Sequence, residues 1–377
     1  MTASAKKPNQ GVVSKTRHIA GRVPSGIWML AGVVVFALVG TVLLAISKAA
    51  TPVASYEVES GTKSGNATTV SDSGASGSSA VKFSSTGAQE LKGWELTPTN
   101  IGLAPFGLSC STLPPYTGSN TPEAGTVISG KLISTNLYLI KGAVTIEKSC
   151  IRPTGSGPHG LISTWDPNNC PNSCATAKGQ VIIRDSEIDG SLIPTQQIAY
   201  TGAFMGVGIL ERNYFHDIGS GIGFYNTGPT YTASAVNNYI HKLRAYGNAA
   251  TTGSHNESAT VRDYDISVNP NRQLTFRGNY MTSDSGNDTG ALFLQAYSGF
   301  IGNVTVENNL LSGGGYQLIL EYKNYGYGNL KSINNRYSGT GYGPGYVTGG
   351  VGWAQWTDNY RYDATKTDGK GTAVNEP

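Results

Sequence analysis

The sequence predicts an all-β chain: a right-handed parallel β-helix, preceded by one N-terminal transmembrane helix. Three observations predict it: a composition typical of frequent turns, a short strand pattern that recurs along the chain, and one long apolar segment near the N-terminus. Glycine accounts for 50 of the 377 residues, and only 14% are charged, against about a quarter in an average soluble domain. This composition indicates turn-rich β structure with few helices.

The apolar segment covers residues 27–46 and carries no charged side chain. A helix of this length crosses the hydrocarbon core of a bilayer, which is about 30 Å thick. Five cations and no acid precede the segment, so we expect residues 1–26 to form a cytoplasmic tail and the rest to lie outside the cell. Secretion after signal cleavage is the alternative, but a signal peptide's apolar region normally has only about 7 to 15 residues.

Charge and cysteine usage agree with export. Without the five N-terminal cations, the 27 basic residues fall to 22 against 24 acidic ones, so the remaining chain has no basic field for nucleic acid. All four cysteines follow the apolar segment, which predicts two disulfides in an oxidising compartment. The short spacing favours Cys170 with Cys174, and therefore Cys110 with Cys150, among three possible connectivities. A zinc site is disfavoured because only His159 is near, so no metal site is expected.

Residues 47–93 are rich in Ser and Gly and predict a stalk. Within them, the stretch from Tyr56 to Phe83 resembles the opening strands of family 6 and family 35 carbohydrate-binding modules. That resemblance implies that Glu57 and Glu59 are calcium ligands, so calcium is the one cofactor considered. A complete module needs well over 100 residues, so the favoured interpretation is a stalk with partial module-like strands.

The internal repeat predicts the fold of residues 94–362. Short alternating strands recur with a Ser or Asn at one fixed place and, in most cases, a Gly-rich turn after it. The polar positions are Ser149, Ser186, Asn213, Asn238, Asn279, Asn309 and Asn335. Their spacing fits one turn of a parallel β-helix per repeat, in which each amide bonds its copies above and below. A leucine-rich solenoid and a β-propeller fit the pattern less well, and residues 363–377 are expected to be a disordered tail.

Two late coils align almost residue for residue and predict the register. Leu294 is expected to stack near Leu320 and Gln295 near Glu321, with Arg262 in the Gln295 column. Over residues 95–350 this architecture resembles the pectate-lyase-like right-handed β-helix superfamily. The resemblance implies a polysaccharide ligand held along one outer face. The superfamily's recognisable catalytic sets are absent, so no catalytic residue is carried over from it.

The candidate site is the face formed by residues 255–263 and 295–323, where charged and polar side chains stack on successive coils. A histidine can remove a proton near neutral pH, and a guanidinium or ammonium group can neutralise a uronate carboxylate. The expected catalytic residues are His255, Arg262, Glu321, Tyr322 and Lys323. The expected substrate-binding residues are Glu257, Gln295, Tyr297, Tyr325 and Tyr327. In this hypothesis Glu321 orients Arg262 through Gln295, and a plain salt-bridged surface is the alternative.

A second group, His216, Asp217 and His241, is open to two interpretations: a metal site, or hydrogen bonds that cap turns, which we favour. The protein is therefore expected to be a single-pass cell-membrane protein whose extracellular domain contacts a polysaccharide or cell-surface glycan. A polysaccharide lyase acting on an acidic glycan is the favoured activity, and hydrolysis is less favoured. A non-catalytic glycan-binding adhesin and a structural surface protein are the alternatives.

Overall fold

The structure is a computed structural model of the chain. It describes residues 67–71, 79–83, 91–165, 179–339 and 341–377. The expected cytoplasmic tail and transmembrane segment lie outside the described residues, as do Cys170, Cys174, Glu57 and Glu59. Among the residues that are described, no helix is long and apolar enough to cross a membrane.

The chain divides into two compact units, residues 1–86 and 87–377. In the first unit, β1 (Ala67–Ser71) pairs antiparallel with β2 (Ser79–Phe83), and this hairpin falls in the predicted stalk. In the second unit, strands from successive coils pair in parallel and form three sheets. The predicted parallel β-helix is therefore confirmed at the level of its coils and sheets.

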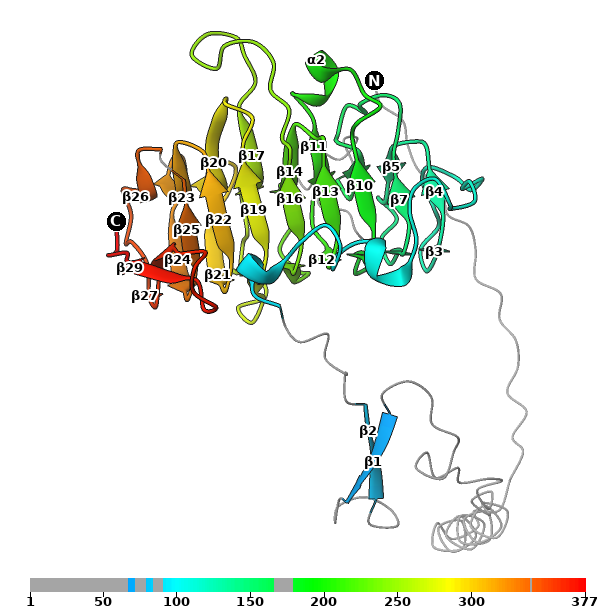
Figure 1. Cartoon of the computed structure of the whole chain (residues 1–377), viewed down its shortest axis with the longest axis horizontal. Coiled ribbons are helices and arrows are strands. Elements are labelled where there is room, and N and C mark those ends of the chain that lie inside the picture. Colours follow the sequence, from blue (N-terminus) through cyan, green and yellow to red (C-terminus); the bar gives the residue numbers. More distant parts are fainter. Residues whose placement is uncertain (1–66, 72–78, 84–90, 166–178, 340) are drawn as a thin grey trace, which may run out of the picture. The chain divides into compact units, whose positions relative to one another are not determined.

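Each coil from β3 to β26 contributes one strand to each sheet, and Figure 1 shows the strands stacked in chain order. The ten-stranded sheet contains β4 (Leu132–Ile133), β7 (Cys150–Ile151), β10 (Glu187–Asp189), β13 (Tyr214–His216), β16 (Tyr239–His241), β19 (Tyr280–Ser283), β22 (Leu310–Gly313), β25 (Arg336–Ser338), β28 (Tyr360–Tyr362) and β29 (Lys370–Ala373). The nine-stranded sheet contains β3 (Val127–Ser129), β6 (Thr145–Glu147), β9 (Ile182–Arg184), β12 (Ile209–Glu211), β15 (Ala233–Val236), β18 (Leu274–Arg277), β21 (Ile301–Glu307), β24 (Tyr327–Ile333) and β27 (Gln355–Thr357).

The eight-stranded sheet carries the candidate site. It contains β5 (Leu137–Tyr138), β8 (Ile162–Ser163), β11 (Gly202–Met205), β14 (Ser220–Phe224), β17 (Asn256–Val261), β20 (Asp288–Ala296), β23 (Tyr316–Tyr322) and β26 (Gly343–Thr348). Helical structure in the described residues is limited to η3 (Gly93–Glu95), η4 (Ala104–Phe106) and α2 (Thr195–Ile198). Inward side chains of all three sheets form one continuous apolar core.

The bend between the nine-stranded and ten-stranded sheets holds the predicted polar ladder. The backbone N–H of each ladder residue donates to the side-chain oxygen of the next, over 2.9–3.1 Å from Ser149 to Asn335, and Asn359 extends the ladder by one coil. The residue before each ladder position has a left-handed φ, for example 48° at Lys148 and 58° at Asn308. The bend thus combines a left-handed residue with a buried polar one in every coil, and the ladder prediction is confirmed.

Residues 91–116, which we call the N-terminal strap, follow a course that the repeat did not predict. The strap crosses the coils from the late ones to the first (Figure 1), with Gly93 N donating to Asn308 O at 2.9 Å and Tyr116 N to Leu132 O at 2.7 Å. The Arg336 guanidinium lies 4.4 Å from the Trp94 ring centre. The strap lies along the coils because its backbone groups bond to bends of different coils, Asn308 and Arg212 among them.

The strap is joined covalently to the early coils. Cys110 and Cys150 form a disulfide, which confirms one of the two predicted pairs.

At the C-terminal end of the solenoid, the expectation of a disordered tail is wrong: β29 pairs antiparallel with β28, and Val374 N donates to Asn359 O at 2.8 Å. The polar composition of the tail suggested disorder, but its backbone covers the last coil.

Candidate functional site

The candidate site is a pair of adjoining clefts on the outer face of the eight-stranded sheet. The larger cleft, of about 460 Å³, runs from His255 across β20 and β23 to β26. The smaller cleft, of about 240 Å³, is lined by residues of β11, β14 and β17. His255 lines both clefts and is exposed, so it stands where the two meet.

The register of this face is the one that the repeat predicted. Leu294 pairs with Leu320 and Gln295 with Glu321. Val261 pairs with Leu294, so the next residue, Arg262, falls in the Gln295 column. This column brings Arg262 and Glu321 to the same face, as expected.

Arg262 presents its guanidinium to the smaller cleft. The guanidinium carbon lies 5.7 Å from the ring centre of Tyr225, 5.3 Å from that of Phe293 and 5.7 Å from that of Tyr297. Its Nε donates to the Tyr225 hydroxyl at 3.3 Å, and within the described part of the chain its two terminal nitrogens have no hydrogen-bond or ion-pair partner. A guanidinium held by rings with its forked donors open is suited to bind a carboxylate.

Glu257 lies in the smaller cleft as a nearly buried carboxyl, 6% exposed. Burial raises its pKa, while a hydrogen bond from Thr289 and the positive charges of Arg262 and His255 oppose that rise. No ion pair to this carboxyl occurs among the described residues. The carboxyl therefore keeps its proton to higher pH than an ordinary glutamic acid, and a protonated carboxyl can donate a hydrogen bond.

Two further buried polar groups near the clefts have unfilled hydrogen-bonding capacity. Thr260 lines the smaller cleft at 2% exposure, and its Oγ1 has no partner in the described residues. Gln295 donates through Nε2 to Glu321, but its Oε1 is buried without a partner there. Unfilled buried polar groups are rare in folded proteins, and these two lie where a ligand in the clefts could supply the missing partner.

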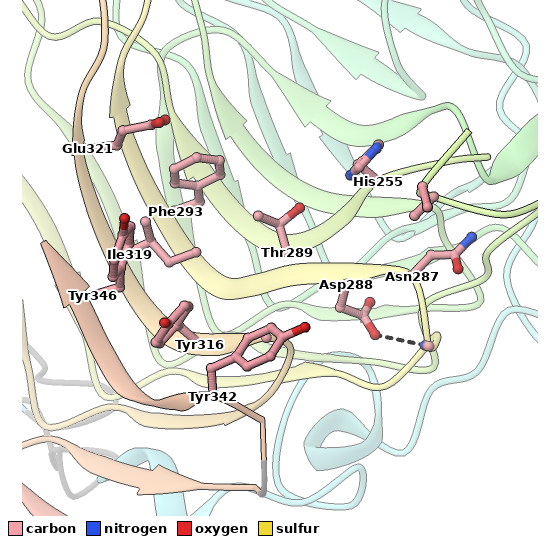
Figure 2. A pocket seen from close by; sticks show the side chains of 14 residues that line it. His255, Asn287, Asp288, Thr289, Phe293, Tyr316, Ile319, Glu321, Tyr342 and Tyr346 are labelled. Carbon is pink, nitrogen blue, oxygen red and sulfur yellow. Dashed lines mark hydrogen bonds between the residues drawn. The ribbon is translucent and has the colours of Figure 1, made fainter. Parts of the chain in front are cut away.

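Aromatic rings form one wall of the larger cleft. Tyr316 stacks on Tyr346 with ring centres 4.9 Å apart and lies 5.6 Å from Tyr342. Figure 2 shows these rings on one side of the cleft, with His255 on the opposite side. Tyr342 is 85% exposed, so its ring offers an apolar face and a hydroxyl to a ligand, as sugars require.

Asp288 also lines the larger cleft, and burial raises its pKa. Its Oδ1 accepts from the Ser285 hydroxyl at 2.6 Å and its Oδ2 from Gly286 N at 2.8 Å. Both oxygens of Asp288 therefore accept hydrogen bonds from the turn before β20, so this carboxyl stabilises the turn.

The structure brings together only part of the predicted site. His255, Glu257, Arg262 and Glu321 line the clefts, and Gln295 lies beside Glu321. Tyr322, Lys323 and Tyr325 are exposed but line neither cleft, and Tyr297 reaches the site only as a ring beside Arg262.

Two predicted roles need correction. Tyr327 is 4% exposed and its hydroxyl donates to Gly349 O, so a substrate-binding role for this side chain is wrong. The expectation that Glu321 orients Arg262 through Gln295 is also not met. Gln295 bonds Glu321, but Tyr225 is what holds Arg262.

The predicted set of site residues did not contain Thr260, Phe293, Asp288, Tyr342 or Tyr346. Thr260, Phe293, Ile319 and Tyr346 form one outward column by strand register. The predicted alignment already placed Arg262, Gln295 and Glu321 in one column. Counting two residues back along each strand from that column gives Thr260, Phe293 and Ile319. Asp288 lies opposite Asn256, next to a shift in register, where alignment by repeat fails.

The group around His216 lies on the ten-stranded sheet. His216 Nδ1 is 2.7 Å from Asp217 Oδ2, its Nε2 is 3.1 Å from Glu187 Oε1, and Arg152 pairs with Asp189 at 2.8 Å. Asp189, His216 and Asp217 could offer ligand atoms within 4.8 Å of one another. Asp189, His216 and Asp217 each already have a protein partner, so we interpret the group as a hydrogen-bonded cluster of side chains. The favoured expectation of bonds to backbone is corrected for His216, whose partners are carboxylates.

Comparisons with protein-family models, with curated proteins and with solved structures found no match to this chain.

Proposed function

We propose that the chain is a membrane-anchored, extracellular β-helix protein of the right-handed, pectate-lyase-like type that binds an acidic polysaccharide in the two clefts and cleaves it by elimination. The charge-free segment 27–46, with its preceding cations, supports the anchor. The Cys110–Cys150 disulfide supports an oxidising compartment.

The observation that carries the proposal is Arg262. Its guanidinium lines a cleft of about 240 Å³, and its terminal nitrogens are open among the described residues. A uronate carboxylate can accept both forked donors, and the hydroxyl of Thr260, which lines the same cleft, can bond a further sugar oxygen. The ring wall of the larger cleft can carry the next sugars of the chain.

Elimination needs the proton beside the uronate carboxylate to be acidified and then removed. Arg262 withdraws charge from the bound carboxylate, which stabilises the carbanion-like transition state. His255 stands between the two clefts and is exposed, so it can take the proton and release it to water. This division of roles keeps two of the five predicted catalytic residues and gives none to Glu321, Tyr322 or Lys323.

The test is an assay of the full-length chain on polyuronates, following the unsaturated product by ultraviolet absorbance. We expect Arg262→Lys and His255→Ala each to lose at least about tenfold in kcat/KM, or about 1.4 kcal/mol of barrier. Arg184→Lys is the matched control, because Arg184 lies on the nine-stranded sheet and pairs with Glu147. Equal activity in all three variants, or no product from any polyuronate, contradicts the proposal.

The aromatic wall favours a second candidate, a non-catalytic glycan-binding adhesin. Stacked tyrosines hold sugars without needing a base, and this wall is the more apolar part of the site. Calorimetric binding of an intact polyuronate with no product over hours would favour the adhesin. A structural surface protein would bind no polyuronate.

A further inference from the structure

We infer that Glu257 is the acid that protonates the leaving glycosidic oxygen when the polysaccharide is cleaved. The inference rests on the proposed function and assigns its missing proton donor. An elimination that only removes a proton would release an alkoxide, a poor leaving group, so a positioned acid lowers the barrier.

The position of Glu257 carries the first step. It lines the smaller cleft together with His255 and Arg262, which lie two residues before it and five after it in the chain. A sugar whose carboxylate sits on Arg262 therefore occupies the same cleft that the proposed base and this carboxyl line.

The environment of Glu257 carries the second step. The side chain is 6% exposed and, within the described residues, forms no ion pair. Burying a charged carboxylate without a counter-charge is costly, so burial favours the protonated form. The groups that face it are His255 and Arg262 from its own segment and Asp288 and Thr289 from β20, with the Ser220 hydroxyl of β14 near its backbone N–H. Burial raises the pKa of this carboxyl despite the two cations, so it keeps a transferable proton to higher pH than an ordinary glutamic acid does.

The other carboxyls at the clefts are less suited to the task. Asp288 has both oxygens bonded within its own turn, to the Ser285 hydroxyl and to Gly286 N. Glu321 accepts a hydrogen bond from Gln295 and belongs to the larger cleft only. Glu257 is the carboxyl of the described clefts that lies beside both Arg262 and His255.

The chemical step balances. His255 takes the proton from the carbon beside the carboxylate, and the electron pair of that C–H bond forms a carbon–carbon double bond. The bond from the neighbouring carbon to the glycosidic oxygen breaks with its electron pair on oxygen. Glu257 delivers its proton to that oxygen, and exchange with water then restores the proton on Glu257 and removes the one on His255.

The experiment compares two substrates with the full-length chain: a natural polyuronate, and a uronate that carries an aryloxy group in place of the glycosidic oxygen on the carbon whose bond breaks, so that the leaving group is a phenolate that needs no proton. Glu257→Gln keeps the shape of the side chain but has no acid. We expect it to lose about 100-fold in kcat/KM on the polyuronate, and less than tenfold on the activated substrate. His255→Ala should lose activity on both. Asp288→Asn, the matched control, should show no difference between the two substrates.

A measurement on the wild type alone makes the test independent of how the variant folds. With the polyuronate, kcat/KM of the wild type should fall at high pH, because cleavage of this substrate needs the protonated acid. With the activated substrate, that alkaline limb of the pH profile should be absent. Equal losses on both substrates in Glu257→Gln, or an alkaline limb that is the same for both, would overturn the inference and leave elimination intact. If the wild type forms no unsaturated product from either substrate, the proposed function fails and the inference falls with it.

Discussion

The ladder bend and the cleft face both bury polar side chains, yet they treat them differently. In the bend, Asn279 makes four hydrogen bonds: two from its amide nitrogen to Ala235 O and Asn309 Oδ1, and two to its oxygen from Asn238. On the cleft face, the hydroxyl of Thr260 has no partner in the described residues, and the buried carboxyl of Glu257 forms no direct ion pair there. The comparison separates polar groups that stabilise the coil from polar groups that remain available to a ligand.

The largest expected effect comes from breaking the ladder. Asn279→Ala removes four hydrogen bonds and leaves buried donors and acceptors of the neighbouring coils unpaired, so we expect the free energy of unfolding to fall by about 4 kcal/mol. Chemical denaturation of wild type and variant measures it. Asn324→Ala is the control: this exposed amide makes one bond, to Tyr297 O, and its loss should cost under about 1 kcal/mol. If both substitutions lowered the free energy of unfolding by similar amounts, the ladder amides would contribute no more to stability than an exposed amide does.

A smaller effect should appear in the pH dependence of stability. The pKa of Glu257 is raised in the folded chain, so the folded state holds the proton more tightly than the unfolded one. The resulting stability is fully present below the ordinary pKa of about 4.5 and is lost as the pH rises through the folded-state pKa. Relative to Glu257→Gln, the wild type should lose up to about 1.4 kcal/mol per pH unit across that window. Parallel stability curves for the two proteins would show that the carboxyl is not held protonated.

The smallest effect concerns the unpaired hydroxyl. Thr260→Val exchanges a buried hydroxyl without a partner for a methyl group of similar size, so we expect the ligand-free protein to gain up to about 1 kcal/mol. Thermal unfolding measures the gain. The same variant should bind polyuronate more weakly. A large loss of stability would mean that the hydroxyl contributes to the fold, as the ladder amides do.

The parts of the fold that repeat could be predicted from the sequence. Asn213, Asn238 and Asn279 recur at one position in successive coils because a buried amide at that bend is useful only if its neighbours match it. The pairing of Gln295 with Glu321 followed from the alignment of two coils without an insertion. The N-terminal strap could not be predicted in this way, because its backbone bonds, its disulfide and its Trp94 ring contact involve different coils and leave no period in the sequence.

The residues of the site were predicted less completely, because most of them also leave no repeating pattern in the sequence. His255 and Arg262 stood out as rare charged residues, whereas Thr260 looks like any strand threonine until its burial beside a cleft is known. Tyr327 was assigned to the ligand because it belongs to a tyrosine-rich stretch. Tyr327 begins β24 and points into the core, whereas Tyr325 lies in the turn before that strand and remains exposed. Which ring faces outward depends on where the bend falls, and that is settled by packing in three dimensions.

The most direct test of the central claim is a crystal structure of the full-length chain with a bound oligouronate. The account predicts a sugar carboxylate within hydrogen-bond distance of both terminal nitrogens of Arg262, a sugar oxygen on Thr260 Oγ1, and the next sugars against Tyr342 and Tyr346. An oligouronate bound elsewhere, or one in the clefts that leaves Arg262 without a carboxylate, would contradict it.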